Sequence, residues 1–336
     1  MDYPKFKAAA VLASPIFLDR EATTEKACKI IEEAAQNGAE LVALPETFIP
    51  SYPWWVWMGI NNVKRGELFR RLFDNAVEVP SETTDALCNC CKKNNIMAVV
   101  GINELGGTTI YNTQLFISRK GVIMGKHRKL MPSGEEKTVW GWGDGSDLKV
   151  YDTEFGKIGG LICYEHSMCL SKYALFAMGE QIHVACWPGA NFKSQPRDRN
   201  KIQDAAIRDI TFEGQVFCIS SCSLCSEEEV NIYIELDPSN EGILEPGGGW
   251  AGIVDPMGNY VAGPLTNEEG IVYGEIDLAK IIPVKHMVDS IGHYARPDVF
   301  TLRLNHSKNV PFELVGSPII QEEVIVENDE VQEEEV

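Results

Sequence analysis

Three residues that could together carry out covalent catalysis each follow a predicted β-strand. The first is Cys163, which ends the apolar segment 157–162 and precedes a helical pattern by a few residues. Backbone N–H groups and the positive end of a helix dipole meet at such an elbow, so we expect a lowered thiol pKa and a nucleophilic sulfur. A buried structural cysteine is the alternative, and it is the more common environment of a single thiol.

Glu46 is the second of these residues. It follows the apolar segment 41–44 and Pro45, and α/β proteins often place functional side chains at the ends of buried strands. A carboxylate in partly apolar surroundings has a raised pKa and can act as a general base. A helix N-cap or an ion pair at the rim is the structural alternative.

Lys129 is the third residue, and it closes the basic segment 126–129. Such a segment can be a solvated edge, but an ammonium held beside the apolar continuation 130–132 could stabilise a developing anion. Glu135 and Glu136 follow closely and could orient the ammonium. A thiol, a carboxylate and an ammonium together suit nucleophilic attack on a carbon bonded to nitrogen.

Alternating strands and helices must hold these residues in place. Apolar alternation and turn signals predict strands at 6–12, 41–44, 96–101, 111–117, 122–125, 148–151, 157–162, 182–187, 215–220 and 271–276. Helical spacing predicts helices near 21–36, 64–75, 81–94 and 199–213, one soon after the cysteine elbow and one from Asp277. The β–α–β start indicates an α/β layered protein. No linker divides the chain, so we expect one domain over residues 1–310.

Charge and composition exclude several classes of partner. The chain of 336 residues carries a formal net charge of −19, which argues against nucleic acid and anionic membranes as partners. Eight acids lie in the last sixteen residues, so we predict a disordered acidic tail over 311–336, although residues 324–326 could dock on a neighbouring subunit. No apolar segment is long enough to cross a bilayer, and no secretory signal is evident. A cytoplasmic location is therefore expected.

Ten cysteines raise the question of a metal site. Cys218, Cys222 and Cys225 have a spacing that some iron–sulfur enzymes use, and a second cluster lies at 88–91. Neither cluster has the paired C-x-x-C and histidine spacing that is typical of zinc sites. We therefore predict reduced, mostly buried thiols and an enzyme that needs no metal and no cofactor.

Five segments, in a consistent order over about residues 5–305, resemble nitrilases of the carbon–nitrogen hydrolase superfamily. These segments are 44–48, 127–130 with 140–146, 160–165, 187–189 and 292–300. The resemblance implies a four-layer α-β-β-α sandwich, in which two sheets lie face to face between outer helices. It also implies a homo-oligomer, either a dimer packed through helices or a larger spiral assembly.

The resemblance further implies a role for each catalytic residue. Cys163 is the expected nucleophile, Glu46 the general base, and Lys129 the group that stabilises tetrahedral intermediates. Glu136 is the expected second glutamate, which positions the others, and Glu135 is the competing choice.

Aromatic residues close to these segments predict the substrate pocket. Tyr164 stands where many nitrilases have tryptophan, which keeps an aromatic wall and adds a hydroxyl. Trp142 follows the lysine segment, whereas the aromatic loop at 50–59 is predicted either to line the pocket or to form a subunit contact. A bulky apolar pocket suits an aliphatic or arylaliphatic nitrile. The predicted pocket residues are Tyr52, Trp57, Trp142, Tyr164 and Trp187.

The predicted reaction is hydrolysis of an organic nitrile to the carboxylic acid and ammonia, through a thioimidate and then a thioester on Cys163. An amidase or N-carbamoyl hydrolase of the same superfamily is one alternative, although segments 140–146 and 296–298 resemble the nitrilase branch more. A cyanide-degrading or cyanide-hydrating enzyme is another, because the pair Glu165-His166 also occurs there. A non-catalytic assembly protein is disfavoured, since all three predicted catalytic residues are present.

Overall fold

The computed structural model describes residues 3–193, 198–310 and 315. Twelve of its strands form one continuous sheet, which divides into two halves that meet where β1 (Lys5–Ala13) and β10 (Phe217–Ser223) run in parallel. In spatial order the first half is β5 (Ile123–Arg128), β4 (Thr109–Ile117), β3 (Met97–Gly106), β2 (Leu41–Ala43), β1 and β14 (Gly270–Asp277). The second half is β6 (Tyr151–Thr153), β7 (Gly156–Ile162), β8 (Ile182–Trp187), β10, β12 (Trp250–Val254) and β13 (Tyr260–Thr266).

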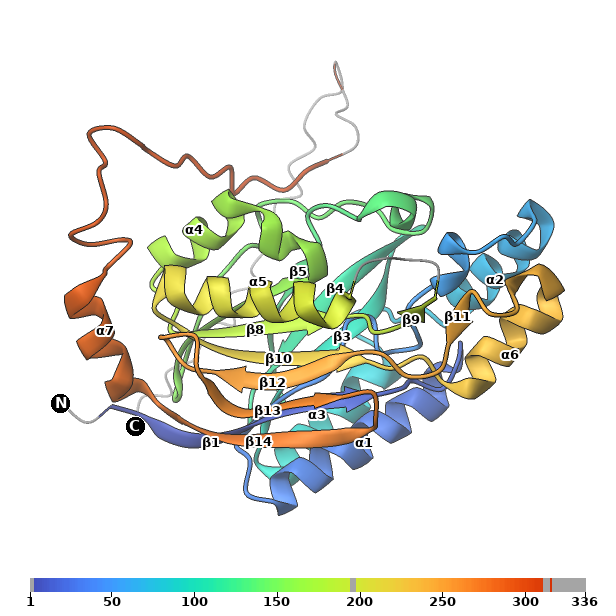
Figure 1. Ribbon diagram of the computed structural model, residues 1–336, viewed down its shortest axis with the longest axis horizontal. Helices are drawn as coiled ribbons and strands as arrows, with labels where there is room; N and C mark the ends of the chain where they lie inside the picture. The colour runs from blue at the N-terminus through green and yellow to red at the C-terminus, as the bar shows by residue number, and fades with distance from the viewer. Residues whose placement is uncertain (1–2, 194–197, 311–314, 316–336) are drawn as a thin grey trace, which may run out of the picture.

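Helices cover the outer face of each half, as Figure 1 shows. The first half carries α1 (Arg20–Gln36) and α3 (Glu82–Asn94), and the second carries α4 (Cys169–Ala177) and α5 (Arg199–Gly214). At one end of the molecule lie α2 (Asn62–Asp74), α6 (Glu227–Leu236) and the short pair β9 (Asn191–Phe192) and β11 (Leu244–Glu245); α7 (Ile281–Met287) lies at the opposite end. The predicted four-layer α-β-β-α sandwich is therefore confirmed.

The two faces of β1 show why the chain forms these layers. Successive side chains of a strand point to opposite faces of the sheet. Ala8, Ala10 and Leu12 belong to the core between the two halves, whereas Ala9 and Val11 belong to the core under the helices. A strand that is buried on both faces reads as a continuous apolar run, which is how this segment appears in the sequence.

A third apolar cluster fills the end of the sandwich near α2 and α6. Trp54 and Trp55, from the aromatic loop, are each only 1% exposed there. Trp55 meets the ring of Phe17 edge-on at 6.3 Å, and Phe17 in turn meets Tyr233 of α6 at 5.5 Å. These two tryptophans are therefore core residues, whereas Trp57 is 36% exposed at the edge of the cluster.

The predicted elements agree with the structure except in a few places. The strand predicted at 148–151 starts only at Tyr151, because Leu148 closes a turn with its N–H on the carbonyl of Gly145. Helix α6 and the β9–β11 pair were not predicted. The predicted tail over 311–336 lies outside the described residues, apart from Val315.

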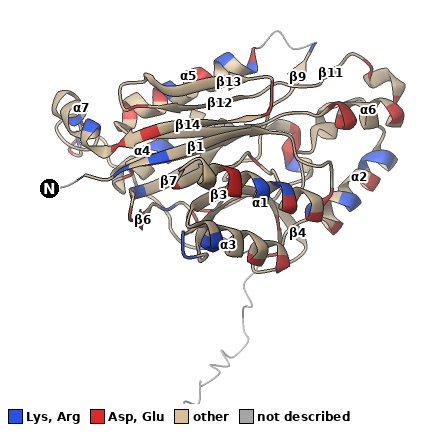
Figure 2. Ribbon diagram, turned by 90° about the horizontal axis from the view of Figure 1, so that it is seen from below, with Lys and Arg blue, Asp and Glu red and all other residues tan. Residues whose placement is uncertain are grey.

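Charged residues of both signs are distributed over the outer helices (Figure 2). In the described part of the chain, no helix combines the length and the apolar character needed to cross a membrane.

Candidate active site

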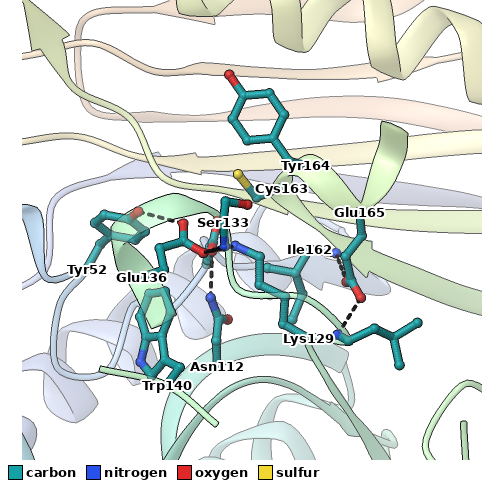
Figure 3. Close-up of polar contacts among 12 residues, drawn as sticks. Tyr52, Asn112, Lys129, Ser133, Glu136, Trp140, Ile162, Cys163, Tyr164 and Glu165 are labelled. Carbon is teal, nitrogen blue, oxygen red and sulfur yellow. Dashed lines mark hydrogen bonds and ion pairs between the residues drawn. The ribbon is translucent and has the colours of Figure 1, made fainter. Parts of the chain in front are cut away.

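The three predicted catalytic residues converge although they come from three different strands. Figure 3 shows Lys129 and Cys163 in this group. Glu46 lies shortly after β2, Lys129 directly after β5 and Cys163 directly after β7. All three residues are buried, each only 1% exposed. One carboxylate oxygen of Glu46, one of Glu136 and the sulfur of Cys163 all lie within 4.8 Å of one another.

Lys129 lies at the centre of this group. Its Nζ is 2.8 Å from Oε1 of Glu46 and 2.8 Å from Oε2 of Glu136, and the three side chains are almost fully buried. Burial by itself would lower the pKa of Lys129, but the charges of Glu136 and Glu46 outweigh it and hold the pKa well above its ordinary value. The ammonium therefore stays charged and keeps the two carboxylates together.

Glu46 has the properties of a general base. Burial raises its pKa to about 7; the charge of Lys129 opposes this shift and that of Glu136 adds to it. The side-chain amide of Asn112, on β4, donates to Oε1 of Glu46 over 2.6 Å. The backbone carbonyl of Asn112 accepts the backbone N–H of Lys129 over 2.8 Å. Oε2 of Glu46 is buried, and no hydrogen-bond donor of the described residues reaches it. This oxygen is free to accept a proton.

Glu136, and not Glu135, is the second glutamate of the group. Glu136 is buried and Glu135 is exposed. The 3-10 turn Gly134–Thr138 places Glu136 so that its Oε2 accepts the N–H of Ser133 over 2.7 Å. Tyr52 donates its hydroxyl to Oε1 of Glu136 over 2.6 Å, and Trp57 donates to the Tyr52 oxygen over 3.1 Å. Tyr52 therefore fixes the orientation of Glu136.

The backbone of Cys163 is in a left-handed conformation, with φ of 53°, which costs a non-glycine residue about 1–2 kcal/mol. In this conformation, at the end of β7, the sulfur lies within 4.8 Å of a carboxylate oxygen of Glu46 and of Glu136. The backbone carbonyl of Cys163 lies 2.7 Å from Nδ1 of His166.

The predicted lowering of the thiol pKa is wrong. Burial raises the pKa of Cys163 well above its ordinary value, and the neighbouring carboxylate of Glu46 raises it further, while Lys129 opposes the shift. The element that follows is the short 3-10 helix Cys163–Ser167, not an α-helix that would present a strong dipole to the sulfur. At rest Cys163 is therefore a neutral thiol, and it would need a base beside it to act as a nucleophile.

Glu165 connects the two halves of the site. Its Oε2 accepts the N–H of Ile162, just before Cys163, over 2.8 Å, and its Oε1 accepts the N–H of Leu130, just after Lys129, over 2.7 Å. The ring of His127 lies 2.9 Å from Oε2, and Glu165 and His127 are both buried. One carboxylate thus ties the nucleophile segment of β7 to the lysine segment of β5.

The basic segment 126–129 is not a solvated edge. Lys126 and Arg128 both pair with the buried carboxylate of Glu104 on β3. The sequence contains no local signal for this pairing, nor for the contacts of Asn112 and Glu165, because each partner comes from a different strand or turn.

The comparisons with known proteins agree with this geometry. The family model described as carbon-nitrogen hydrolase matches residues 7–286. The chain belongs to the carbon–nitrogen hydrolase family.

Several relatives that are similar to most of this chain are named nitrilases. A nitrilase of Bacillus sp. (strain OxB-1) is 39% identical, over 94% of this chain and 92% of its own length. An aliphatic nitrilase of Rhodococcus rhodochrous is also 39% identical, over 94% of this chain and 86% of its own. The crystal structure of a carbon-nitrogen hydrolase from Helicobacter pylori shares the fold, with a TM-score of 0.71 at 19% identity over 88% of this chain and 97% of that one.

The predicted pocket residues of this carbon–nitrogen hydrolase do not all lie together. Tyr164 and Trp187 contact each other edge-on at 6.2 Å, and together with Arg199 they line a narrow cavity in the part of the chain that the structure describes. Figure 3 shows Tyr164 beside the sulfur of Cys163. Trp142, in contrast, is 58% exposed.

The donor set of the site could hold a metal ion, because Glu46, Glu136 and Cys163 each offer one ligand atom. The Lys129 ammonium already lies 2.8 Å from both carboxylates and so takes the position of a cation. All ten cysteines are free thiols. Cys218 and Cys222 are buried in β10, and neither cysteine cluster forms a metal-binding group among residues 3–193 and 198–310.

Proposed function

We propose that this enzyme is a nitrilase, which hydrolyses an organic nitrile to the carboxylic acid and ammonia. The observation that carries the proposal is a buried neutral thiol within 4.8 Å of a carboxylate whose pKa is about 7 and whose second oxygen is unoccupied. A base with a pKa near the working pH is suited to proton transfer in both directions. The 39% identity to a nitrilase over 94% of the chain supports the same reaction.

In the first half of the reaction, Glu46 accepts the thiol proton of Cys163 while the sulfur adds to the nitrile carbon. The proton passes to the nitrile nitrogen, which gives a thioimidate. Glu46 then takes a proton from water, whose oxygen adds to the same carbon. The Lys129 ammonium, held by two carboxylates, stabilises the charge that develops on the tetrahedral carbon's substituents.

In the second half, Glu46 passes the proton that it took from water to the nitrogen, the hydroxyl proton of the tetrahedral carbon follows it, and the C–N bond breaks to release ammonia. A thioester remains on Cys163. A second water, again deprotonated by Glu46, adds to the thioester carbon. The C–S bond then breaks, and Glu46 returns the proton to the sulfur. Two waters and one nitrile thus yield one acid and one ammonia. If the C–S bond breaks before the C–N bond, an amide leaves instead.

Glu136 and Tyr52 position this machinery. Glu136 holds the second side of the Lys129 ammonium, and the Tyr52 hydroxyl is committed to Glu136. Burial and the charges of Glu136 and Glu46 raise the pKa of Tyr52 well above its ordinary value, so the phenol remains a donor. We therefore assign Tyr52 to positioning instead of the substrate contact that its sequence context predicts.

A substrate contact is best supported for Tyr164 and Trp187, because Tyr164 lies beside the sulfur of Cys163 in Figure 3 and its ring contacts that of Trp187. We propose that Trp57 and Trp142 lie at its rim, because they are 36% and 58% exposed. Aromatic walls of this kind suit an aliphatic or arylaliphatic nitrile.

We further propose that residues 1–310 act as one catalytic domain and that the enzyme is a cytoplasmic homo-oligomer. Leu170 of α4 and Phe212 of α5 are 69% and 50% exposed on the outer layer of the second half-sheet. Apolar side chains exposed on neighbouring helices favour the packing of a second copy against them. Ten free thiols fit a reducing compartment.

The test is ammonia release from a panel of aliphatic and arylaliphatic nitriles and from the matching amides, with Cys163→Ala as the control. The proposal predicts ammonia and carboxylic acid from nitriles and no product from the variant. Activity on amides alone would make the enzyme an amidase, and activity that survives in Cys163→Ala would refute the assigned nucleophile.

A further inference from the structure

Three titratable side chains that the proposed reaction does not use form a buried row behind Cys163. Glu180 Oε1 lies 2.9 Å from Nδ1 of His183, and Nε2 of His183 lies 3.0 Å from Nε2 of His166. Nδ1 of His166 lies 2.7 Å from the backbone carbonyl oxygen of Cys163. Glu180 is 3% exposed, His166 2% and His183 0%. The row therefore connects the interior of the second half-sheet to the backbone of the nucleophile.

One end of the row determines the position of every proton in it. A carbonyl oxygen can only accept, so Nδ1 of His166 carries the hydrogen that reaches Cys163. In a neutral imidazole Nε2 of His166 is then an acceptor, and Nε2 of His183 must donate to it. Nδ1 of His183 is in turn an acceptor, and it takes its hydrogen from a protonated Glu180.

The environment supports neutral groups throughout. Burial raises the pKa of Glu180 well above its ordinary value. Burial lowers the pKa of His183 to about 3, and it lowers that of His166, next to His183, to about 3 as well. At neutral pH the row therefore consists of one carboxylic acid and two uncharged imidazoles, which is the arrangement that the hydrogen-bond directions require.

Two neighbouring residues, Gly159 and Trp187, accommodate this row. Gly159 of β7 lies directly opposite His183 of β8 in the sheet, and a Cβ at residue 159 would collide with the Glu180 carboxyl. Trp187 stacks on His166, with ring centroids 4.9 Å apart and an angle of 24° between the planes. Gly159 thus leaves space for the Glu180 carboxyl. The indole of Trp187 fixes the ring of His166, which ends the row.

We propose that Glu180, His183 and His166 are positioning residues, which hold the carbonyl of Cys163 and so keep its left-handed backbone and its sulfur in place for attack. Glu165 holds the N–H of the preceding residue, Ile162, from the other side. The N–H of Ile162 and the carbonyl of Cys163 are thereby both held by buried side chains. The proposal rests on Cys163 being the nucleophile of the proposed nitrilase reaction.

The variants that test it separate the donor from the volume at residue 180. Glu180→Gln keeps a donor, because an amide N–H can reach Nδ1 of His183, whereas Glu180→Leu has a similar size and no donor. His166→Phe keeps an aromatic ring against Trp187 but cannot donate to Cys163. We expect Glu180→Gln to retain kcat within about threefold, and the other two to lose about tenfold in kcat with KM changed less than about twofold.

Two further readouts do not depend on nitrile hydrolysis. The rate of Cys163 alkylation by iodoacetamide should fall about tenfold in Glu180→Leu and His166→Phe and remain near the wild-type rate in Glu180→Gln. The double variant Glu180→Leu, His166→Phe should be no slower than the slower single variant, because both changes interrupt one row. Additive losses, or equal losses in Glu180→Gln and Glu180→Leu, would overturn the proposal.

The wild-type protein provides a test that no folding defect can obscure. Histidine-selective ¹⁵N NMR at neutral pH should show one buried imidazole with its proton on Nδ1 and a second, in contact with it, with its proton on Nε2. An imidazolium at either position, or the opposite pair of tautomers, would overturn the proposed row. Alkylation and NMR need no turnover. They can therefore refute the proposed row whether or not the protein hydrolyses nitriles.

Discussion

Replacement of Glu136 by glutamine should make Glu46 a weaker base, in a direction that the charges of the site determine. The charge of Glu136 raises the pKa of Glu46, which is about 7 in the intact site. Glutamine removes this charge and leaves the Lys129 ammonium to act on Glu46 alone. The pKa of Glu46 should therefore fall, and the base should remain ionised at lower pH.

The geometry sets the size of this shift. The two carboxylates have oxygens within 4.8 Å of each other, and unit charges at that distance interact by about 0.9 kcal/mol at a dielectric constant of 80 and by about 3.5 kcal/mol at 20. At about 1.36 kcal/mol per pKa unit, these limits correspond to about 0.6 and about 2.5 units. We expect a fall of about one unit, since Lys129 lies between the two groups.

The assay is the pH dependence of kcat/KM for nitrile hydrolysis, whose acid limb reports the essential base of the free enzyme. The limb should move to lower pH in Glu136→Gln, even though the rate at the plateau falls because Lys129 loses one of its two partners. If turnover is too slow to measure, the pH dependence of Cys163 alkylation gives the same limb. Glu135→Gln is the matched control, because it removes the same charge from the exposed neighbour. An acid limb that stays in place or moves to higher pH in Glu136→Gln would show that the charge of Glu136 does not raise the pKa of Glu46.

Three further predictions follow from the site. Lys129→Met should lower kcat by at least about 100-fold and move the acid limb to higher pH, opposite to Glu136→Gln, because Lys129 lowers the pKa of Glu46; a limb that moves down contradicts this. Glu165→Gln leaves one backbone N–H facing an amide N–H and breaks the buried pair with His127. It should lower the free energy of unfolding by about 3–5 kcal/mol, and the Tm in calorimetry by about 4–7 °C. An unchanged Tm would contradict this prediction. Tyr164→Ala should change the ratio of kcat/KM between arylaliphatic and short aliphatic nitriles by about tenfold, whereas an unchanged ratio would remove Tyr164 from the pocket.

The convergence of the three candidate catalytic residues could be predicted from the sequence because each one follows a predicted strand, and for Glu46 and Cys163 this strand is an apolar run that is mostly buried in the structure. Glu46, Lys129 and Cys163 all lie just beyond the ends of β2, β5 and β7. These three strands run in the same direction, so their carboxyl ends lie at the same edge of the sheet. Strands buried on both faces and amphipathic helices leave few ways to pack, so an α/β layered protein could be predicted from the residues. The order of the four layers came from the resemblance to nitrilases.

The residues that support the site could not be predicted, because their partners are distant in the sequence. Asn112 reaches Glu46 across 66 residues, and its segment is indistinguishable from any other strand. Glu165 contacts the backbone of Leu130, 35 residues away, from the other half of the sheet. The thiol pKa was mispredicted for the same reason: a local elbow gives no information on how deeply Cys163 is buried or which charges lie beside it.

In the proposed reaction a nitrile carbon becomes bonded to Cys163. Rapid acid quenching during turnover of an arylaliphatic nitrile, followed by peptide mass spectrometry, measures this bond directly. We expect a substrate-dependent mass increase, that of the thioimidate or the thioester, on the peptide that contains Cys163, and none in Cys163→Ala. An unmodified Cys163 peptide in an enzyme that is releasing ammonia in a single-turnover experiment, or an adduct on another residue, would contradict it.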